Sequence, residues 1–137
     1  MVIKDIMSDP AVVVHKSFSI SDTAGIMREN NIGAVPVVDS DDKIIGIVTD
    51  RDIVIRATAR GLNPDTTKIS DIMSENVSCV SPDTDIDEVA DKMSRDKVRR
   101  IPVVDNGIVM GVVALSDVAL CRDYKIECAE AFCEIIK

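Results

Sequence analysis

The 137-residue chain has no tryptophan, one tyrosine and two phenylalanines, so its core must be assembled from aliphatic side chains. It has a single histidine, His15, which any Ser-His-Asp or Cys-His catalytic arrangement would have to use. Glycine-rich phosphate loops of the GxGxxG or GxxxxGK[ST] type are absent. Because 46% of the residues are hydrophobic, enough material for a core remains. We therefore expect a folded protein that is not an enzyme.

Positive charge is also scarce. The chain has 16 lysines and arginines and 24 acidic residues, which give a net charge of −8. An acidic surface repels the phosphates of nucleic acids and of anionic membranes, so we expect neither as the main partner. No apolar run reaches the roughly 20 residues of a membrane span. The first residues lack the charged and apolar regions of a signal peptide. The expected location is the cytoplasm.

The four cysteines, Cys79, Cys121, Cys128 and Cys133, form no Cys-x-x-Cys pair. The spacings typical of zinc clips and thioredoxin-like sites are therefore missing, and we predict no metal site. Two interpretations stay open for these side chains. They are thiols without a chemical role, or they have a redox or metal role that assembles across a dimer.

What the sequence does contain is an internal duplication. The hexad Ile3–Ser8 (Ile-Lys-Asp-Ile-Met-Ser) returns 66 residues later as Ile69–Ser74 (Ile-Ser-Asp-Ile-Met-Ser). Further matches are Pro36–Asp39 with Pro102–Asp105 and, after one deletion, Gly46–Val48 with Gly111–Val113 and Asp52 with Asp117. Self-similarity of this extent at a nearly fixed offset indicates two copies of one structural unit.

Each copy predicts the order strand–helix–strand–strand–helix, an α/β arrangement of the α+β type. We expect Ser21 and Asp87 to cap the first helix of each copy. The closing helix of copy one is expected from Thr49 to about Arg60, with Gly61 as its left-handed stop. The expected strands are residues 12–14, 34–38 and 44–49 in copy one and 79–80, 101–104 and 108–114 in copy two.

These patterns divide the chain into residues 1–62 (first motif), 63–68 (linker), 69–123 (second motif) and 124–137 (helical tail). One motif is too small to bury its own sheet, so we expect the two to pack together with pseudo-two-fold symmetry. The tail has apolar character on a segment that we predict to be helical. It is expected either to extend the preceding helix or to form a separate helix that covers an open face or a dimer interface.

The segments Ile32–Asp39 and Gly46–Ile53 together resemble a CBS (cystathionine-β-synthase) motif, and so do Val98–Asp105 and Gly111–Val113 with Asp117. The resemblance covers roughly residues 2–123, and the stretch Thr49–Pro64 looks like the free-standing bacterial two-CBS proteins of the hypoxic-response group. It implies a paired-CBS (Bateman) module without a catalytic domain of its own. Members of this family commonly form homodimers. Many bind adenine nucleotides or S-adenosylmethionine between the motifs, and some bind no nucleotide.

Thr49 and Asp52 form the first candidate ligand-binding pair. A carboxylate can accept both hydroxyl hydrogens of a ribose, while a threonine hydroxyl reaches the ribose or a phosphate. The same spacing also describes a helix N-cap with an acidic residue at the third helical position. Both roles can hold at once, because a helix start also presents free N–H groups.

Arg99 and Arg100 form the second candidate pair, since guanidinium groups match phosphate oxygens in a bidentate manner. The alternative is a solvated strand end that makes weak surface ion pairs. Lys97 and Arg51 are weaker candidates.

The two copies are not equivalent at these positions. Gly33 and Ala34 replace the arginine pair in copy one. Copy two keeps Asp117, which is a further candidate ligand-binding residue, but has Ala114 in place of the threonine. If a cleft takes ribose contacts from one copy and phosphate contacts from the other, one site is complete, with Thr49, Asp52, Arg99 and Arg100. The symmetry-related site is then degraded.

The expected function is that of a regulatory sensor. It would bind AMP, ADP, ATP or S-adenosylmethionine in the cleft between the motifs, without a required cofactor, and signal to an unknown effector protein. The alternative is an interaction module, a dimer whose clefts no longer bind a ligand.

Overall fold

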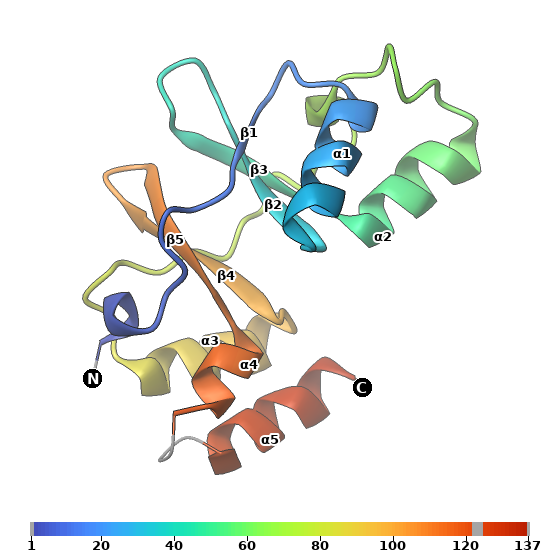
Figure 1. Ribbon diagram of the computed structural model, residues 1–137. Helices are drawn as coiled ribbons and strands as arrows, with labels where there is room; N and C mark the ends of the chain where they lie inside the picture. The colour runs from blue at the N-terminus through green and yellow to red at the C-terminus, as the bar shows by residue number, and fades with distance from the viewer. Residues whose placement is uncertain (1, 122–124, 137) are drawn as a thin grey trace. The chain divides into compact units, whose positions relative to one another are not determined.

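The computed structural model describes residues 2–121 and 125–136, and the side chains of residues 125–128 are not part of the description. The chain forms two compact units (Figure 1). The copy-1 unit is Val12–Val77, and the copy-2 unit combines the N-terminal segment up to Ala11 with the chain from Ser78 onward. No helix among the described residues is long and apolar enough to cross a membrane.

The copy-1 unit contains a three-stranded sheet in the order β1-β2-β3. Its strands and helices are β1 (Val14–His15), α1 (Ile20–Asn30), β2 (Ala34–Val38), β3 (Ile44–Thr49), α2 (Asp50–Asp52), η2 (Ile53–Ala57), η3 (Thr58–Arg60) and η4 (Ile69–Asp71). β1 runs parallel to β2, and β2 pairs with β3 in antiparallel fashion. The helical stretch that starts with α2 ends at Gly61, whose φ of 68° is left-handed. The predicted element order and this helix stop are both confirmed.

The copy-2 unit has a two-stranded sheet, β4-β5. Its elements are η1 (Ile3–Asp5), α3 (Ile86–Asp96), β4 (Arg100–Asp105), β5 (Ile108–Ala114), α4 (Leu115–Ala119) and α5 (Lys125–Ile135). The strand predicted at Cys79–Val80 is reduced to a single parallel bridge between Val80 and Val103. The tail forms a separate helix, α5, which packs along α3 and α4 (Figure 1).

Aliphatic side chains fill the two cores, as the lack of aromatic residues requires. Val35, Val37 and Val48 are fully buried in copy one, and Ile101, Val103 and Val113 are fully buried at related positions in copy two. The alternation of buried and less buried residues in β3 and β5 shows that these strands are not covered equally on both faces. The α+β fold class is confirmed, and the pseudo-two-fold packing stays a prediction.

Each hexad belongs to one sequence copy but packs on the sheet of the other copy. The first hexad lies in the copy-2 unit, where Ser8 donates its N–H to the carbonyl of Val112 on β5 at 3.0 Å. The second hexad lies in the copy-1 unit, where Ser74 and Ile47 of β3 exchange two backbone hydrogen bonds of 2.9 Å. The compact units therefore divide the chain at other places than the sequence repeats do. The domain boundaries proposed from the sequence stay predictions.

Both predicted N-caps of the first helices are wrong. Ser19 caps α1 by accepting the N–H of Asp22 at 2.9 Å, and Asp85 precedes α3 without a side-chain cap. The helices start earlier because Ile20 and Ile86 are their first residues and are almost completely buried. Ser21 lies inside α1 and donates its hydroxyl to Asp65 at 2.6 Å instead.

Candidate ligand-binding site

Thr49 and Asp52 form a complete capping box at the start of α2. The Thr49 hydroxyl accepts the N–H of Asp52 at 3.1 Å, and the Asp52 carboxylate accepts the N–H of Thr49 at 2.9 Å. The capping interpretation of this pair is confirmed. It leaves the hydroxyl hydrogen of Thr49 for further interactions, while the second carboxylate oxygen of Asp52, which lies 3.7 Å from Nε of Arg56, still has a lone pair to accept a further hydrogen bond. A ligand contact by the same two residues is therefore compatible with the cap.

Arg56 connects this capping box to the second hexad, a link that the sequence did not lead us to expect. Its Nε lies 3.7 Å from Oδ1 of Asp52, and its Nη1 donates to the carbonyls of Ile72 and Met73 at 3.2 and 3.3 Å. The only sequence signal is the spacing of four residues between Asp52 and Arg56, which places both on one helix face. The Asp52 carboxylate is thus contacted by the backbone N–H of Thr49 and by the guanidinium group of Arg56.

Copy two keeps half of this arrangement. Asp117 accepts the N–H of Ala114 at 2.9 Å, the same backbone bond that Asp52 accepts in copy one. Alanine has no hydroxyl, so the reciprocal bond cannot form. Cys121 occupies the position of Arg56 and donates its thiol to the carbonyl of Asp117 at 3.6 Å. The carboxylate of copy two therefore lacks both the threonine and the arginine that accompany its counterpart.

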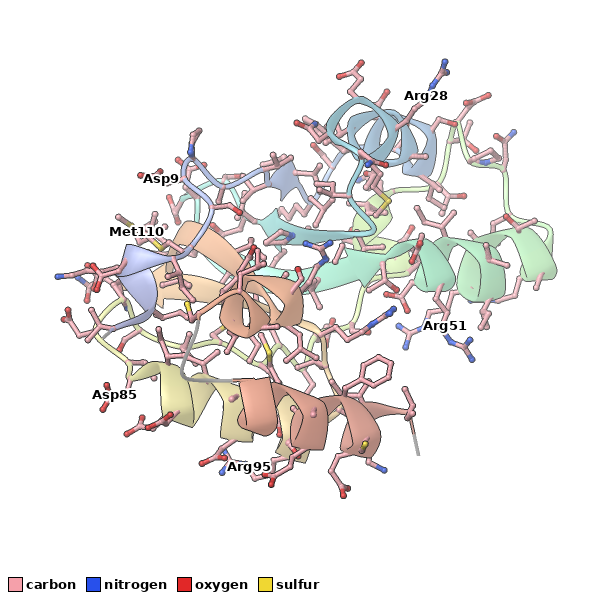
Figure 2. All side chains as sticks on the ribbon, turned by 60° about the horizontal axis from the view of Figure 1, so that its bottom comes forward. Asp9, Arg28, Arg51, Asp85, Arg95 and Met110 are labelled. Atoms are coloured by element: carbon pink, nitrogen blue, oxygen red, sulfur yellow. The ribbon has the colours of Figure 1, made fainter. Side chains whose placement is uncertain are left out.

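The arginine pair lies at the start of β4 in the copy-2 unit. Arg99 and Arg100 are exposed, and neither guanidinium has a hydrogen-bond or ion-pair partner among the described residues. The surface ion pairs that would have explained them structurally are therefore not formed. Lys97 is exposed in a left-handed conformation just after α3. Arg51 is exposed at the start of α2 in the other unit (Figure 2).

The two copies carry opposite charge at one shared backbone contact. The N–H of Asp50 bonds to the carbonyl of Gly33 at 2.9 Å, and in copy two the N–H of Leu115 bonds to the carbonyl of Arg99 at 2.8 Å. A Cβ on Gly33 would lie 3.1 Å from a carboxylate oxygen of Asp50, so this carboxylate occupies the space beside the glycine. At this contact, copy one thus presents the carboxylate of Asp50, whereas copy two presents the guanidinium group of Arg99.

Other potential sites among the described residues lack the residues that ligand binding, catalysis or metal binding would need. Two surface grooves of the copy-2 unit, beside α3, include none of the candidate ligand residues. His15 hydrogen bonds with Ser17 at 2.6 Å, with no acidic partner in the bonds described for it. Burial raises the pKa of the Cys79 thiol, while Lys92 opposes that shift. The described side chains, those of residues 2–121 and 129–136, contain no group of three His, Cys, Asp or Glu suited to a metal ion.

The chain is similar to known proteins over most of its length. It is 34% identical over 116 residues to Hypoxic response protein 1 of Mycobacterium tuberculosis. The alignment covers 85% of this chain and 81% of that protein. The crystal structure of Hypoxic Response Protein I with two coordinated zinc ions matches with a TM-score of 0.82 and 33% identity, over 88% of this chain and 98% of that one.

A second solved structure adds a ligand. The CBS domain pair of protein MJ0100, in complex with 5′-methylthioadenosine and S-adenosyl-L-methionine, matches with a TM-score of 0.80 and 35% identity, over 91% of this chain and 98% of that one. The sequence profile of the CBS domain matches twice, at residues 3–57 and 69–122. Together with the two α+β units, these matches show that the chain belongs to the CBS domain family and is a tandem CBS pair.

Proposed function

We propose that this CBS pair binds an adenosyl ligand with residues of both motifs and acts as a regulatory sensor. The observation that carries the proposal is its likeness to the MJ0100 domain pair, whose structure contains 5′-methylthioadenosine and S-adenosyl-L-methionine. AMP, ADP and ATP belong to the same ligand class, because all of these molecules share an adenosine. No cofactor is required for this function.

Two features of the described residues support an adenosyl ligand. The Thr49–Asp52 capping box retains a hydroxyl hydrogen and an accepting lone pair on the carboxylate oxygen that faces Arg56, which suit the ribose hydroxyls. Arg99 and Arg100 are exposed guanidinium groups without a described partner, and they suit phosphate or carboxylate oxygens. We propose that these four residues make one competent site. Asp117 is the corresponding candidate of the degraded second site, and Lys97 and Arg51 are weaker candidates.

The sensor is proposed to act as a cytoplasmic homodimer that passes its ligand state to an effector protein. A ligand shifts a protein between two states only by as much as its affinities for them differ, typically about 1–3 kcal/mol. The proposal treats the chain as regulatory and not catalytic, because its single histidine bonds to serine hydroxyls.

A second candidate function is an interaction module that binds no ligand. The observation that favours it is that Thr49, Asp52 and Asp117 all make hydrogen bonds that stabilise their own helix starts. Under this alternative, these residues are retained for folding alone.

A ligand-induced shift in thermal stability separates the two functions. At a ligand concentration one hundred times the dissociation constant, binding should stabilise the protein by about 2.7 kcal/mol. The ligands are AMP, ATP, S-adenosylmethionine and 5′-methylthioadenosine. No shift with any of them would favour the interaction module.

The arginine pair can be tested in the same assay. Arg99→Ala combined with Arg100→Ala should weaken binding of AMP and ATP and leave 5′-methylthioadenosine, which has no phosphate, nearly unaffected. Arg95→Ala, at an exposed arginine of α3 (Figure 2), is the matched control. Equal losses for all ligands would contradict a phosphate role of the pair.

A further inference from the structure

Arg56 joins two parts of the copy-1 unit that lie far apart in the sequence. Its guanidinium group is planar and carries its N–H donors in a fixed fork. Nε lies 3.7 Å from Oδ1 of Asp52, whereas Nη1 donates to the carbonyls of Ile72 and Met73 at 3.2 and 3.3 Å. Because the group is rigid, a shift of either neighbour moves the guanidinium plane that the other neighbour contacts. Arg56 therefore forms a bridge between the candidate ligand residue Asp52 and the second hexad.

The two carbonyls that Arg56 contacts follow a single helical turn. η4 ends at Asp71, and none of the described backbone hydrogen bonds has either of these carbonyls as its acceptor. Arginine side chains commonly donate to such carbonyls at the end of a helix. The next residue, Ser74, exchanges two backbone hydrogen bonds of 2.9 Å with Ile47 of β3. Arg56 thus supports the hexad at the point where it docks on the sheet.

Copy two shows that a hexad can dock without this arginine. Ser8 of the first hexad donates its N–H to the carbonyl of Val112 at 3.0 Å. Cys121 takes the position of Arg56, and no described side chain links Asp117 to the first hexad. Docking of a hexad therefore does not by itself require the arginine. The bridge occurs in the copy that also has the complete capping box.

The contact with Arg56 orients the Asp52 carboxylate without using up its acceptor capacity. The distance of 3.7 Å between Nε and Oδ1 is too long for a hydrogen bond but allows electrostatic attraction. The other carboxylate oxygen accepts the N–H of Thr49 at 2.9 Å. The Asp52 side chain is 16% exposed, so water and salt screen the pair less than they would on an open surface. The two contacts fix the carboxylate plane and leave Oδ1 able to accept from a ligand hydroxyl.

We propose that Arg56 is a positioning residue, which orients Asp52 for the ligand and couples ligand binding to docking of the second hexad. The inference rests on the proposed adenosyl site. A ligand hydroxyl that donates to Oδ1 favours the carboxylate orientation that also keeps Arg56 on the hexad carbonyls. Such coupling is reciprocal, so the docked hexad also favours ligand binding. The chain enters the copy-2 unit at Ser78, shortly after the hexad, so the ligand state reaches the segment that connects the two units.

Isothermal titration and hydrogen–deuterium exchange of the hexad amides test the coupling on the wild type, Arg56→Gln and Arg60→Gln. Arg60 is the matched control, because it is an exposed arginine of the same helical stretch without a described partner. The probes are AMP, ATP, S-adenosylmethionine and 5′-methylthioadenosine. The probe that binds should slow deuterium uptake at residues 72–74 of the wild type and of Arg60→Gln. Arg56→Gln should bind it about fivefold more weakly, the lower end of typical coupling between sites, and show no such protection.

The ligand-free proteins test the bridge separately from ligand binding. Arg56→Gln and Asp52→Asn should each speed deuterium uptake by the hexad amides, since either substitution removes one charge of the bridge. Arg60→Gln should leave the uptake unchanged. Arg56→Lys replaces Arg56→Gln if circular dichroism shows that the latter is unfolded. Lysine keeps the charge but lacks the fork that reaches both neighbours, so ligand-dependent protection should again be lost.

Three outcomes would overturn the proposal. Equal deuterium uptake by ligand-free Arg56→Gln and Arg60→Gln means that the arginine does not support the hexad. Equal affinity of these two variants, or ligand-dependent protection that persists in Arg56→Gln, means that the coupling does not pass through the arginine. A wild type that binds none of the probes contradicts the proposed function and the positioning role with it. That failure is recognised because the ligand-free comparison still reports on the bridge.

Discussion

Asp52 and Asp117 accept the same backbone hydrogen bond, but different side chains surround them. Each carboxylate accepts the N–H of the residue that precedes its helix, at 2.9 Å. Only Asp52 is accompanied by a threonine hydroxyl and an arginine, both within the copy-1 unit. The duplication therefore supplies its own control, because the two carboxylates share the backbone hydrogen bond at the helix start and do not share the proposed ligand role.

Asp39 gives a pH-dependent prediction at the same scale. Its carboxylate accepts the backbone N–H groups of Lys43 and Asp41 in the β2–β3 turn at 3.0 and 2.9 Å. The bond from Lys43 contributes most to lowering the pKa of Asp39, and desolvation partly opposes it. A lowered folded-state pKa stabilises the protein above the unfolded value of about 3.9, and this stability is lost as the pH falls through the folded value.

We therefore expect Asp39→Asn to lose less stability than the wild type on acidification below about pH 4. Asparagine keeps an oxygen acceptor for the turn but does not titrate in this range. Thermal unfolding between about pH 2.5 and pH 7 measures the difference. Parallel curves for the two proteins would show that the charge of Asp39 does not contribute.

At the scale of elements, the hexads fix the outer edges of both hairpins. A Cβ on Gly46 would lie 2.9 Å from the carbonyl oxygen of Ser74 and against the sulfur of Met73. A Cβ on Gly111 would lie 2.8 Å from the sulfur of Met7 and against the carbonyl of Ser8. The repeated glycines of β3 and β5 are thus explained by close approach of the hexad backbone.

Gly46→Ala and Gly111→Ala should each destabilise the protein by about 1–3 kcal/mol, because the hexad must shift to admit the methyl group. Gly25→Ala is the matched control in the interior of α1, where a Cβ would meet nothing within 4 Å. It should stabilise by about 0.5–1 kcal/mol, since alanine is the better helix former. Urea unfolding of the three variants measures these changes. A destabilising Gly25→Ala or a neutral Gly46→Ala would contradict this interpretation.

The sequence could predict the elements of each copy but not where the hexads dock. The apolar strands of the two hairpins and the left-handed Gly61 are local signals, and both were found where expected. The hexad exchange is a long-range contact between segments whose sequences are nearly identical, so no local pattern distinguishes the two possible partners. The cap positions were missed because burial of Ile20 and Ile86, and not the identity of the polar residue, sets the helix start.

At the scale of the whole molecule, the duplicated sequence has diverged into two unequal halves. Copy one has the full capping box and an acidic helix start, whereas copy two has the arginines and the covering helix α5. The sequence could predict this division of candidate ligand residues because the repeat alignment exposes each replacement. It could not predict the role of Arg56, whose partners in the second hexad depend on the exchange.

The central claim is that one adenosyl site per chain uses Asp52 and not Asp117. Isothermal titration with S-adenosylmethionine and 5′-methylthioadenosine tests it on the wild type, Asp52→Asn and Asp117→Asn. Asparagine keeps the acceptor for the backbone N–H in both variants, so the cap is preserved equally. A lost hydrogen bond to a charged group costs about 1.5–3 kcal/mol, or roughly 10- to 100-fold in affinity.

For the ligand that binds, we predict one molecule per chain, at least about tenfold weaker binding for Asp52→Asn, and wild-type affinity for Asp117→Asn. Two molecules per wild-type chain, or a loss confined to Asp117→Asn, would contradict the claim.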